Sequence, residues 1–215
     1  MSGTLTPKAR HNLLLFVLSF IYIFVIGLFS DFKNLNFVYY IFISSIYFVS
    51  ILTIKDKSNY YFYISAVMIV LTWISDFLDL PLLSRITGII STLFFFLIIV
   101  FLIVRVARSK TVGMLEFLES INIYLLLGIA GSILFGIIYR QNHDAYNPPG
   151  EILTSQSDFI YYSFVTMTTL GYGDITPNDS LARSLSIFFS VTGQLYLTMI
   201  IAMLVGKYLS NQPKN

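Results

Sequence analysis

The stretch TMTTLGYGDITP, from Thr166 to Pro177, is a short polar insert between two apolar segments. Within it, Gly171 and Gly173 alternate with residues that carry side chains, and glycine adopts left-handed backbone angles at little cost. This alternation allows a backbone whose carbonyl oxygens all turn toward one axis. Oxygens arranged in that way can replace the hydration shell of a cation. The insert is therefore a candidate ion-coordinating segment.

The composition indicates that the rest of the chain lies in a membrane. Of 215 residues, 56% are hydrophobic and 11% are charged, whereas about 25% of the residues in a soluble domain are charged. The chain has no cysteine, which excludes disulfides and thiolate metal sites. Its net charge of +2 gives no support for nucleic-acid binding. We expect an all-α integral membrane protein.

Six apolar segments are long enough to cross a bilayer, which takes roughly 20 helical residues. They cover residues 12–30, 36–54, 60–78, 84–106, 120–139 and 181–209. The first is too long for a typical signal-peptide core and lacks a cleavage site, so we expect it to be retained. A shorter apolar piece at 157–168 precedes the insert and is predicted to be a re-entrant helix.

The distribution of basic residues predicts the orientation. Nine lie on one side of the membrane and four on the other; the nine are Lys8, Arg10, Lys55, Lys57, Arg105, Arg108, Lys110, Lys207 and Lys214. Because cytoplasmic loops carry the excess of Lys and Arg, both termini are expected in the cytoplasm. The insert then opens toward the outside.

The chain is predicted to divide near Ser109–Gly113, into a four-helix front module (1–110) and a second unit (111–215). The second unit would contain an interfacial segment from Met114 to Ser120, a helix, an outer loop, the re-entrant helix, the insert and the last helix. Ser157 or Asp158 is the predicted N-cap of the re-entrant helix.

The motif TMTTLGYGD resembles the pore signature of the potassium channel family, in which Thr-Val-Gly-Tyr-Gly-Asp follows a short pore helix. The resemblance covers the C-terminal part of the chain as helix, pore helix, filter and helix. It implies a six-helix subunit with one pore loop and voltage-gated-like architecture. It also implies a homotetramer in contact with membrane lipids, because one loop supplies one quarter of a fourfold carbonyl cage.

The resemblance implies roles for individual residues. The filter would be Thr169, Leu170, Gly171, Tyr172 and Gly173, with K⁺ held at Thr169, Leu170, Gly171 and Tyr172. Filter support would come from Thr168, Asp174, Tyr161 and Tyr162, since a phenol can donate a hydrogen bond to the Asp174 carboxylate. K⁺ would be the permeant ion, and no cofactor is expected.

One residue departs from the family pattern: the usual valine is Leu170. Its carbonyl is retained, but the larger side chain must pack behind the filter. The sequence therefore keeps a non-selective cation channel open as an alternative.

The last helix is expected to line the conduction path. Gly193 stands where the family often has a hinge glycine, and close packing is an equal alternative. The residues expected toward the path are Gln194, Leu197, Ile201, Ala202 and Val205. A polar glutamine in a membrane helix fits a wet cavity, with a buried bond to a neighbouring helix as the alternative.

The front module does not carry the charges of a voltage sensor. Arg85 lies at the start of the fourth helix and Arg105 and Arg108 lie at its end, with nothing charged between them. A sensor needs several basic residues within this helix. The short tail also predicts that no cytosolic ligand-binding domain is attached.

Two other functions receive little support. The pattern Gly171-Tyr172-Gly173-Asp174 fits the Gly-x-Gly-Asp of intramembrane aspartyl proteases, but no second aspartate lies inside a spanning helix. Potassium-uptake transporters use four related loops in one chain, whereas this chain has one. We expect a channel rather than an enzyme, in a prokaryotic plasma membrane.

Overall fold

The structure is a computed structural model that describes residues 6–26, 35–54, 60–78, 80–109, 113–147, 153 and 155–210. The helices are α1 (Pro7–Phe20), η1 (Ile21–Val25), α2 (Leu35–Ile54), α3 (Tyr60–Phe77), α4 (Pro81–Arg108), α5 (Met114–Gln141), η3 (His143–Ala145), α6 (Gln156–Met167) and α7 (Ser180–Ser210). The strands β1 (Tyr146–Asn147) and β2 (Thr176–Pro177) pair in antiparallel fashion.

Five helical stretches within the described ranges are long and apolar enough to cross a membrane. They are Pro7–Val25, Phe37–Ile54, Ile86–Arg108, Met114–Gln141 and Ser180–Met203. The predicted all-α membrane fold is confirmed. The remaining predicted segment, 60–78, forms α3, but several of its side chains lie outside the described part of the chain. A count of six spanning helices stays a prediction.

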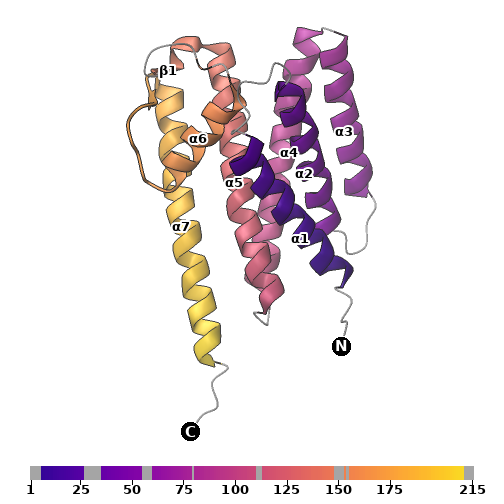
Figure 1. Ribbon diagram of the computed structural model, residues 1–215, viewed down its shortest axis with the longest axis vertical. Helices are drawn as coiled ribbons and strands as arrows, with labels where there is room; N and C mark the ends of the chain where they lie inside the picture. The colour runs from indigo at the N-terminus through magenta and orange to yellow at the C-terminus, as the bar shows by residue number, and fades with distance from the viewer. Residues whose placement is uncertain are drawn as a thin grey trace.

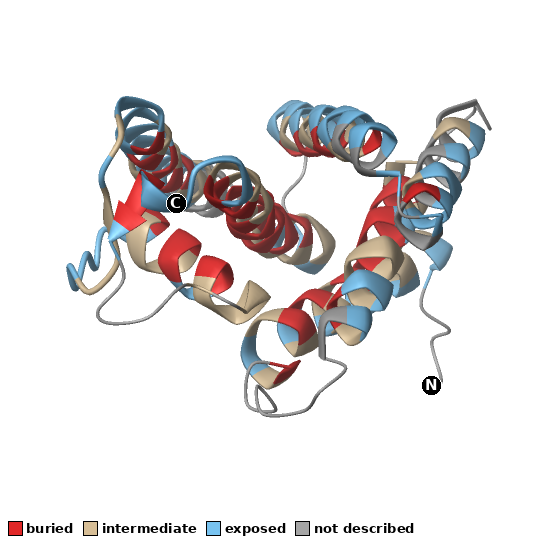
Figure 2. Cartoon of the chain, turned by 90° about the horizontal axis from the view of Figure 1, so that it is seen from above, coloured by how far each residue is buried: buried red, intermediate tan, exposed pale blue. Residues whose placement is uncertain are grey.

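The helices run alongside one another, and α1 begins and α7 ends at the same end of the molecule (Figure 1). The short α6 lies between α5 and α7, toward the opposite end (Figure 1). The central helix is α5, which packs against α1 and α4 on one side and against α6 and α7 on the other. Seen from above, the buried sides of the helices face one another (Figure 2).

The central position of α5 follows from its composition. It is apolar around most of its circumference, and Leu126, Ile129 and Phe135 are fully buried. The helix begins at Met114, so the residues from Met114 to Ser120 form its first part rather than an element separate from it. The Glu116 carboxylate accepts a hydrogen bond from the Gly113 N–H (2.9 Å), which satisfies a donor at the helix start and extends the helix to that point.

Aromatic packing supports the end of the molecule that carries α6. Phe135 of α5 contacts Tyr146 of β1, Tyr162 of α6 and Phe189 of α7, at ring distances of 6.1, 4.9 and 5.4 Å. Large rings in such arrangements fill space at low conformational cost. One buried ring therefore connects four elements around the polar insert.

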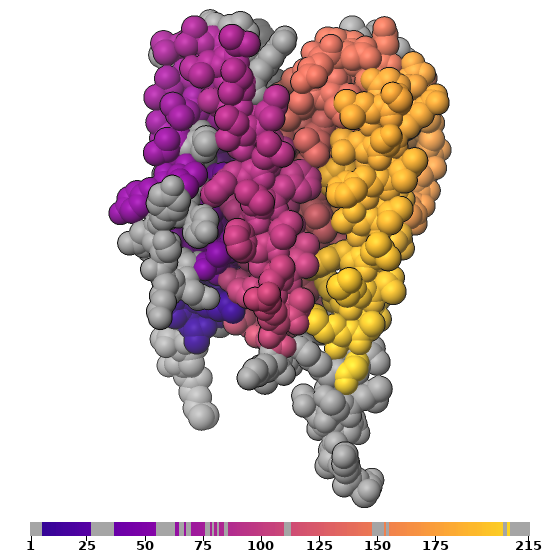
Figure 3. All heavy atoms as spheres, turned by 180° about the vertical axis from the view of Figure 1, so that it is seen from behind, coloured from indigo at the N-terminus to yellow at the C-terminus, as the bar shows by residue number. Residues whose placement is uncertain are grey.

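Within the described ranges, the apolar side of α7 away from α5 is exposed in the single chain. This helix forms a continuous strip of surface in the space-filling view (Figure 3). Its exposed apolar residues are Leu181, Ile187, Phe188, Val191, Leu195, Met199 and Ile201, each at least half exposed.

Candidate functional site

The helix α6 starts with a capping box. The Ser155 hydroxyl accepts a hydrogen bond from the Ser157 N–H (3.3 Å), and the Asp158 carboxylate accepts one from the Ser155 N–H (3.1 Å). The predicted N-cap at Ser157 or Asp158 is therefore wrong, since Ser155 is the cap. Asp158 contributes as the third helical residue.

Small residues on α5 allow α6 to approach closely. A Cβ on Gly128 would lie 2.3 Å from the Phe164 ring, and one on Gly131 would lie 2.4 Å from the Ser163 hydroxyl. That hydroxyl donates to the Gly128 carbonyl at 2.7 Å. Sequence reasoning did not identify these two glycines, although small residues at helix interfaces in membranes are a known sign of close packing.

Two contacts join α6 to α7. The Tyr162 hydroxyl lies 2.7 Å from the Ser186 hydroxyl, so the prediction that Tyr162 donates to Asp174 is wrong. At the other end of α6, a Cβ on Gly193 would lie 2.3 Å from Met167 Cγ and 2.4 Å from the Met167 carbonyl oxygen. Gly193 therefore has a close-packing role here, which is one of the two alternatives left by the sequence.

The insert follows directly from α6, which ends at Met167. The Thr168 hydroxyl donates to the Phe164 carbonyl at 2.7 Å, and the Leu170 N–H donates to the Val165 carbonyl at 3.0 Å. The Phe164 carbonyl also accepts the Thr168 N–H at 2.9 Å, whereas the Val165 carbonyl depends on donors from the insert beyond the helix end. The insert is thus anchored to the last turn of α6.

The backbone of the insert alternates in handedness. Thr169, Gly171 and Gly173 have positive φ angles of 60°, 55° and 81°, while the intervening Leu170 and Tyr172 do not. Positive φ is easy for glycine but unusual for a β-branched residue such as Thr169. The alternation predicted from the two glycines therefore extends one step further, to a threonine. Leu170 and Tyr172 are 56% and 67% exposed in the single chain.

Asp174 ends the insert and is held by two donors. The Tyr161 phenol donates to Oδ2 (2.5 Å) and the Ile175 N–H donates to Oδ1 (3.0 Å). The hydrogen bond from Tyr161 is the main cause that lowers the pKa of Asp174 below its ordinary value. The same bond is the main cause that raises the pKa of Tyr161 to about 12. The bond predicted between Tyr161 and Asp174 is present.

The chain beyond Asp174 is tied to the outer loop. Tyr146 and Asn147 of β1 pair with Pro177 and Thr176 of β2. The Asp179 carboxylate accepts a hydrogen bond from the Ala182 N–H at 2.6 Å, at the start of α7. Both ends of the insert are therefore fixed, by α6 on one side and by α7 on the other.

The predicted path-lining residues of α7 differ in their positions. Gln194, Ile201 and Ala202 are exposed, Leu197 is half-buried, and the side chain of Val205 lies outside the described residues. The Gln194 Nε2 atom is 3.4 Å from the Thr169 hydroxyl, as a hydrogen-bond donor. Of the expected path residues, Gln194 therefore directly contacts the insert.

A polar cluster around the buried Glu119, made of Lys8, Asn12, Arg105 and Glu119, lies where the front helices meet α5. Glu119 is 2% exposed, and its Oε1 atom lies 3.1 Å from Lys8 Nζ and 3.0 Å from an Arg105 nitrogen. Asn12 donates to the same atom at 3.2 Å, and Arg105 also donates to the Thr53 carbonyl. Sequence reasoning interpreted Arg105 as a topology signal and missed this cluster.

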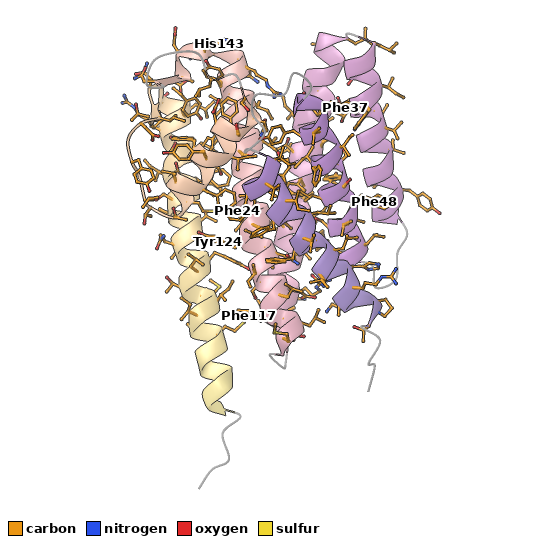
Figure 4. All side chains as sticks on the ribbon, in the orientation of Figure 1. Phe24, Phe37, Phe48, Phe117, Tyr124 and His143 are labelled. Carbon is orange, nitrogen blue, oxygen red and sulfur yellow. The ribbon has the colours of Figure 1, made fainter. Side chains whose placement is uncertain are left out.

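The same region contacts α7. The Tyr196 hydroxyl donates to the Ser120 carbonyl at 2.9 Å, and its ring stacks on Tyr124, with centroids 6.3 Å apart. Tyr124 lies between α5 and α7 (Figure 4).

No group of three metal-ligating side chains occurs among the described residues.

Comparisons with known proteins identify relatives of this part of the chain. Residues 123–210 match the family model described as ion channel. The chain is 34% identical over 90 residues to two-pore potassium channel 2 of Arabidopsis thaliana. The aligned residues cover 42% of this chain and 18% of the relative. It is 43% identical over 93 residues to two-pore potassium channel 1 of the same plant, covering 43% and 22%.

An archaeal protein is also similar. The chain is 31% identical over 86 residues to a voltage-gated potassium channel of Aeropyrum pernix, covering 39% of this chain and 28% of the relative. The chain thus spans less than a third of the length of these relatives. The resemblance of the C-terminal part to potassium channels is confirmed, and that part is related to the ion channel family.

Proposed function

We propose that this chain is one subunit of a potassium-selective channel that conducts K⁺ passively down its electrochemical gradient. The observation that supports it best is the alternation of positive φ at Thr169, Gly171 and Gly173. This alternation lies directly after a short helix, in a segment related to channels that are named for potassium. Alternating handedness turns successive carbonyls to one side, as cation coordination requires.

In this proposal K⁺ is held at Thr169, Leu170, Gly171 and Tyr172, with the Thr169 hydroxyl as a further ligand. Gly173 completes the filter, and Asp174, Tyr161 and Thr168 support it from outside and below. The protein needs no cofactor and catalyses no covalent reaction, because conduction requires only binding that is favourable enough for entry and weak enough for exit.

The working unit is a homotetramer. One chain supplies one quarter of a carbonyl cage, and its filter residues and the outer face of α7 are exposed and largely apolar. An unpaired filter backbone in a bilayer is costly, because no water satisfies it. Three further copies would cover these surfaces.

The test is the reversal potential of purified protein in a planar bilayer, with K⁺ on one side and Na⁺ on the other. A large shift toward the potassium equilibrium potential is expected. A reversal near zero with real current would contradict potassium selectivity and favour a non-selective cation channel. Leu170, which replaces the usual valine, is the observation that favours this second candidate.

A matched variant separates the two candidates. Leu170→Val restores the usual residue and leaves the filter backbone unchanged. If the wild-type channel is non-selective because of Leu170, this variant should gain selectivity. If both proteins select K⁺ equally, the larger side chain is accommodated without effect.

The front module (1–110) adjoins the pore unit (111–215) and does not act as a charge-driven voltage sensor. No basic residue lies between Arg85 and Arg105 in α4, and Arg105 is paired with Glu119. Few fixed charges can therefore move in the membrane field. A steep conductance–voltage curve that disappears in Arg85→Gln would contradict this.

The protein lies in a prokaryotic plasma membrane with both termini in the cytoplasm and the filter opening outward. The excess of basic residues on one side supports this orientation. Because the chain has no native cysteine, single cysteines report it directly. His143→Cys in intact cells should react with an impermeant thiol reagent, and Met114→Cys should react only after lysis. The reverse pattern would invert the orientation.

A further inference from the structure

Thr169 occupies a strained backbone position at the inner end of the filter. Its φ of 60° is unusual for a β-branched residue, and such conformations persist only where the surroundings hold them. Its N–H donates to the Thr166 carbonyl at 3.0 Å, and its hydroxyl donates to the Thr168 carbonyl at 2.6 Å. Both of these bonds are local, to residues within the same turn.

The only non-local hydrogen bond to Thr169 within the described part of the chain comes from α7. Gln194 Nε2 lies 3.4 Å from the Thr169 hydroxyl oxygen, a long contact for an N–H donor. The hydroxyl has a single proton, and the Thr168 carbonyl already accepts it. The glutamine must therefore present its N–H group to this oxygen, which fixes the orientation of the amide. One lone pair of the hydroxyl then remains for a cation.

The position of Gln194 is fixed by its neighbour Gly193. The α7 backbone lies so close to the end of α6 that a Cβ on Gly193 would be 2.4 Å from the Met167 carbonyl oxygen. Backbone atoms cannot yield as the tip of a side chain can, so α7 keeps this register against α6. The amide of the next residue is then held beside the inner end of the filter.

We propose that Gln194 is a positioning residue for the innermost cation site, since its amide holds the Thr169 hydroxyl in the geometry that coordinates a dehydrated K⁺. In the tetramer, four such amides surround the inner mouth of the filter. The inference rests on the proposed function, because it assumes that Thr169 is a filter residue. The inference gives Gln194 a defined hydrogen bond to the Thr169 hydroxyl, in addition to its expected place along the conduction path.

The experiment measures K⁺ binding to the detergent-solubilised full chain by titration calorimetry, with an impermeant organic cation as the background salt. Gln194→Met retains the length of the side chain and removes the donor. Its K⁺ affinity should fall about threefold to fivefold, the effect of one weak hydrogen bond. Thr198→Val is the matched control, since the Thr198 hydroxyl lies one turn further along α7 and donates to the Gln194 carbonyl rather than to Thr169.

Two variants of Thr169, each combined with Gln194→Met, separate a positioning role of Gln194 from general damage to the fold. In Thr169→Ser the hydroxyl remains, so Gln194→Met should lower the affinity by the same factor. In Thr169→Val the hydroxyl is gone, so Gln194→Met should have no further effect. Size-exclusion chromatography confirms that each variant keeps the wild-type assembly. An unchanged affinity in Gln194→Met, an equal loss in Thr198→Val, or additive losses in Thr169→Val would each overturn the inference.

Failure of the inference about Gln194 can be distinguished from failure of the proposed function. If the wild-type chain selects K⁺ in the bilayer but Gln194→Met binds it normally, only the inference fails. If the wild-type chain binds Na⁺ as tightly as K⁺, potassium selectivity fails. The same set of variants titrated with Na⁺ then decides the role of Gln194, because the amide acts on Thr169 whichever cation is bound. Wild-type protein that binds neither cation overturns both.

Discussion

Gly173 combines a φ of 81° with open space where a Cβ would point. Gly173→Ala should therefore cause no clash, but it places a side chain in a left-handed conformation at a cost of roughly 1–2 kcal/mol. That cost is small for the whole fold and large for one filter backbone. We expect loss of selective conduction with the assembly intact, measured by reversal potential and size-exclusion chromatography. Unchanged selectivity would contradict the filter assignment.

Tyr161 and Tyr162 are adjacent but have different partners, which allows a matched test. Tyr161→Phe removes the donor to Asp174, whereas Tyr162→Phe removes the contact with Ser186. The hydrogen bond from Tyr161 lowers the pKa of Asp174. The stability that this hydrogen bond contributes is therefore fully present at pH values above the ordinary pKa of aspartate. It is lost as the pH falls through the lowered value.

Conduction in Tyr161→Phe should therefore fail at a higher pH than in the wild-type protein. The midpoint should move up toward the ordinary aspartate pKa of about 3.9. Single-channel open times recorded between neutral and acidic pH measure it, and Tyr162→Phe should keep the wild-type midpoint. An equal shift in both variants would show that Asp174 does not depend on this phenol.

At the scale of elements, the cluster of Lys8, Asn12, Arg105 and Glu119 joins α1 and α4 to α5. Removing one partner from a buried ion pair typically costs about 3–5 kcal/mol, because the other charge is left buried and unpaired. Glu119→Leu should therefore loosen α1 and α4. We expect faster amide hydrogen exchange in these helices and a lower melting temperature.

Two variants control for this prediction. Glu116→Gln changes a carboxylate one turn earlier that contacts only the Gly113 N–H among the described residues, so a far smaller effect is expected. Replacing both partners, Arg105→Met with Glu119→Leu, should recover much of the stability, because the largely buried Arg105 charge is removed and Lys8, which is 41% exposed, stays in contact with water. If the double variant is as unstable as Glu119→Leu, the packing rather than the charge of Glu119 holds the helices.

Individual elements also differ in how much of their structure could be predicted from the sequence. The insert was predictable because its information is local: two alternating glycines after a short apolar piece. The contacts of Tyr162 with Ser186 and of Arg105 with Glu119 join side chains on different helices, and helical periodicity does not select such partners. The cap at Ser155 was missed because Ser155, Ser157 and Asp158 are all good capping residues. Only geometry distinguishes them.

At the scale of the whole molecule, the proposed carbonyl cage predicts an assembly of four copies, and the exposed strip of α7 is the surface expected to be covered in it. Light scattering of the solubilised protein, corrected for detergent, should give four times the 24.5 kDa of one chain. Val191 on α7 and Val100 on α4 are both about half exposed, and they allow a matched substitution. A large side chain cannot be accommodated between tightly packed subunits, whereas it can extend into lipid.

Val191→Trp should therefore dissociate the tetramer or prevent its formation, and Val100→Trp should leave it intact. Both changes keep the surface apolar, so membrane insertion is not the variable. If Val100→Trp dissociates the assembly and Val191→Trp does not, the subunits meet through the front helices rather than through α7. The filter residues of one chain would then lack partners, and the proposed carbonyl cage would have no means of closing.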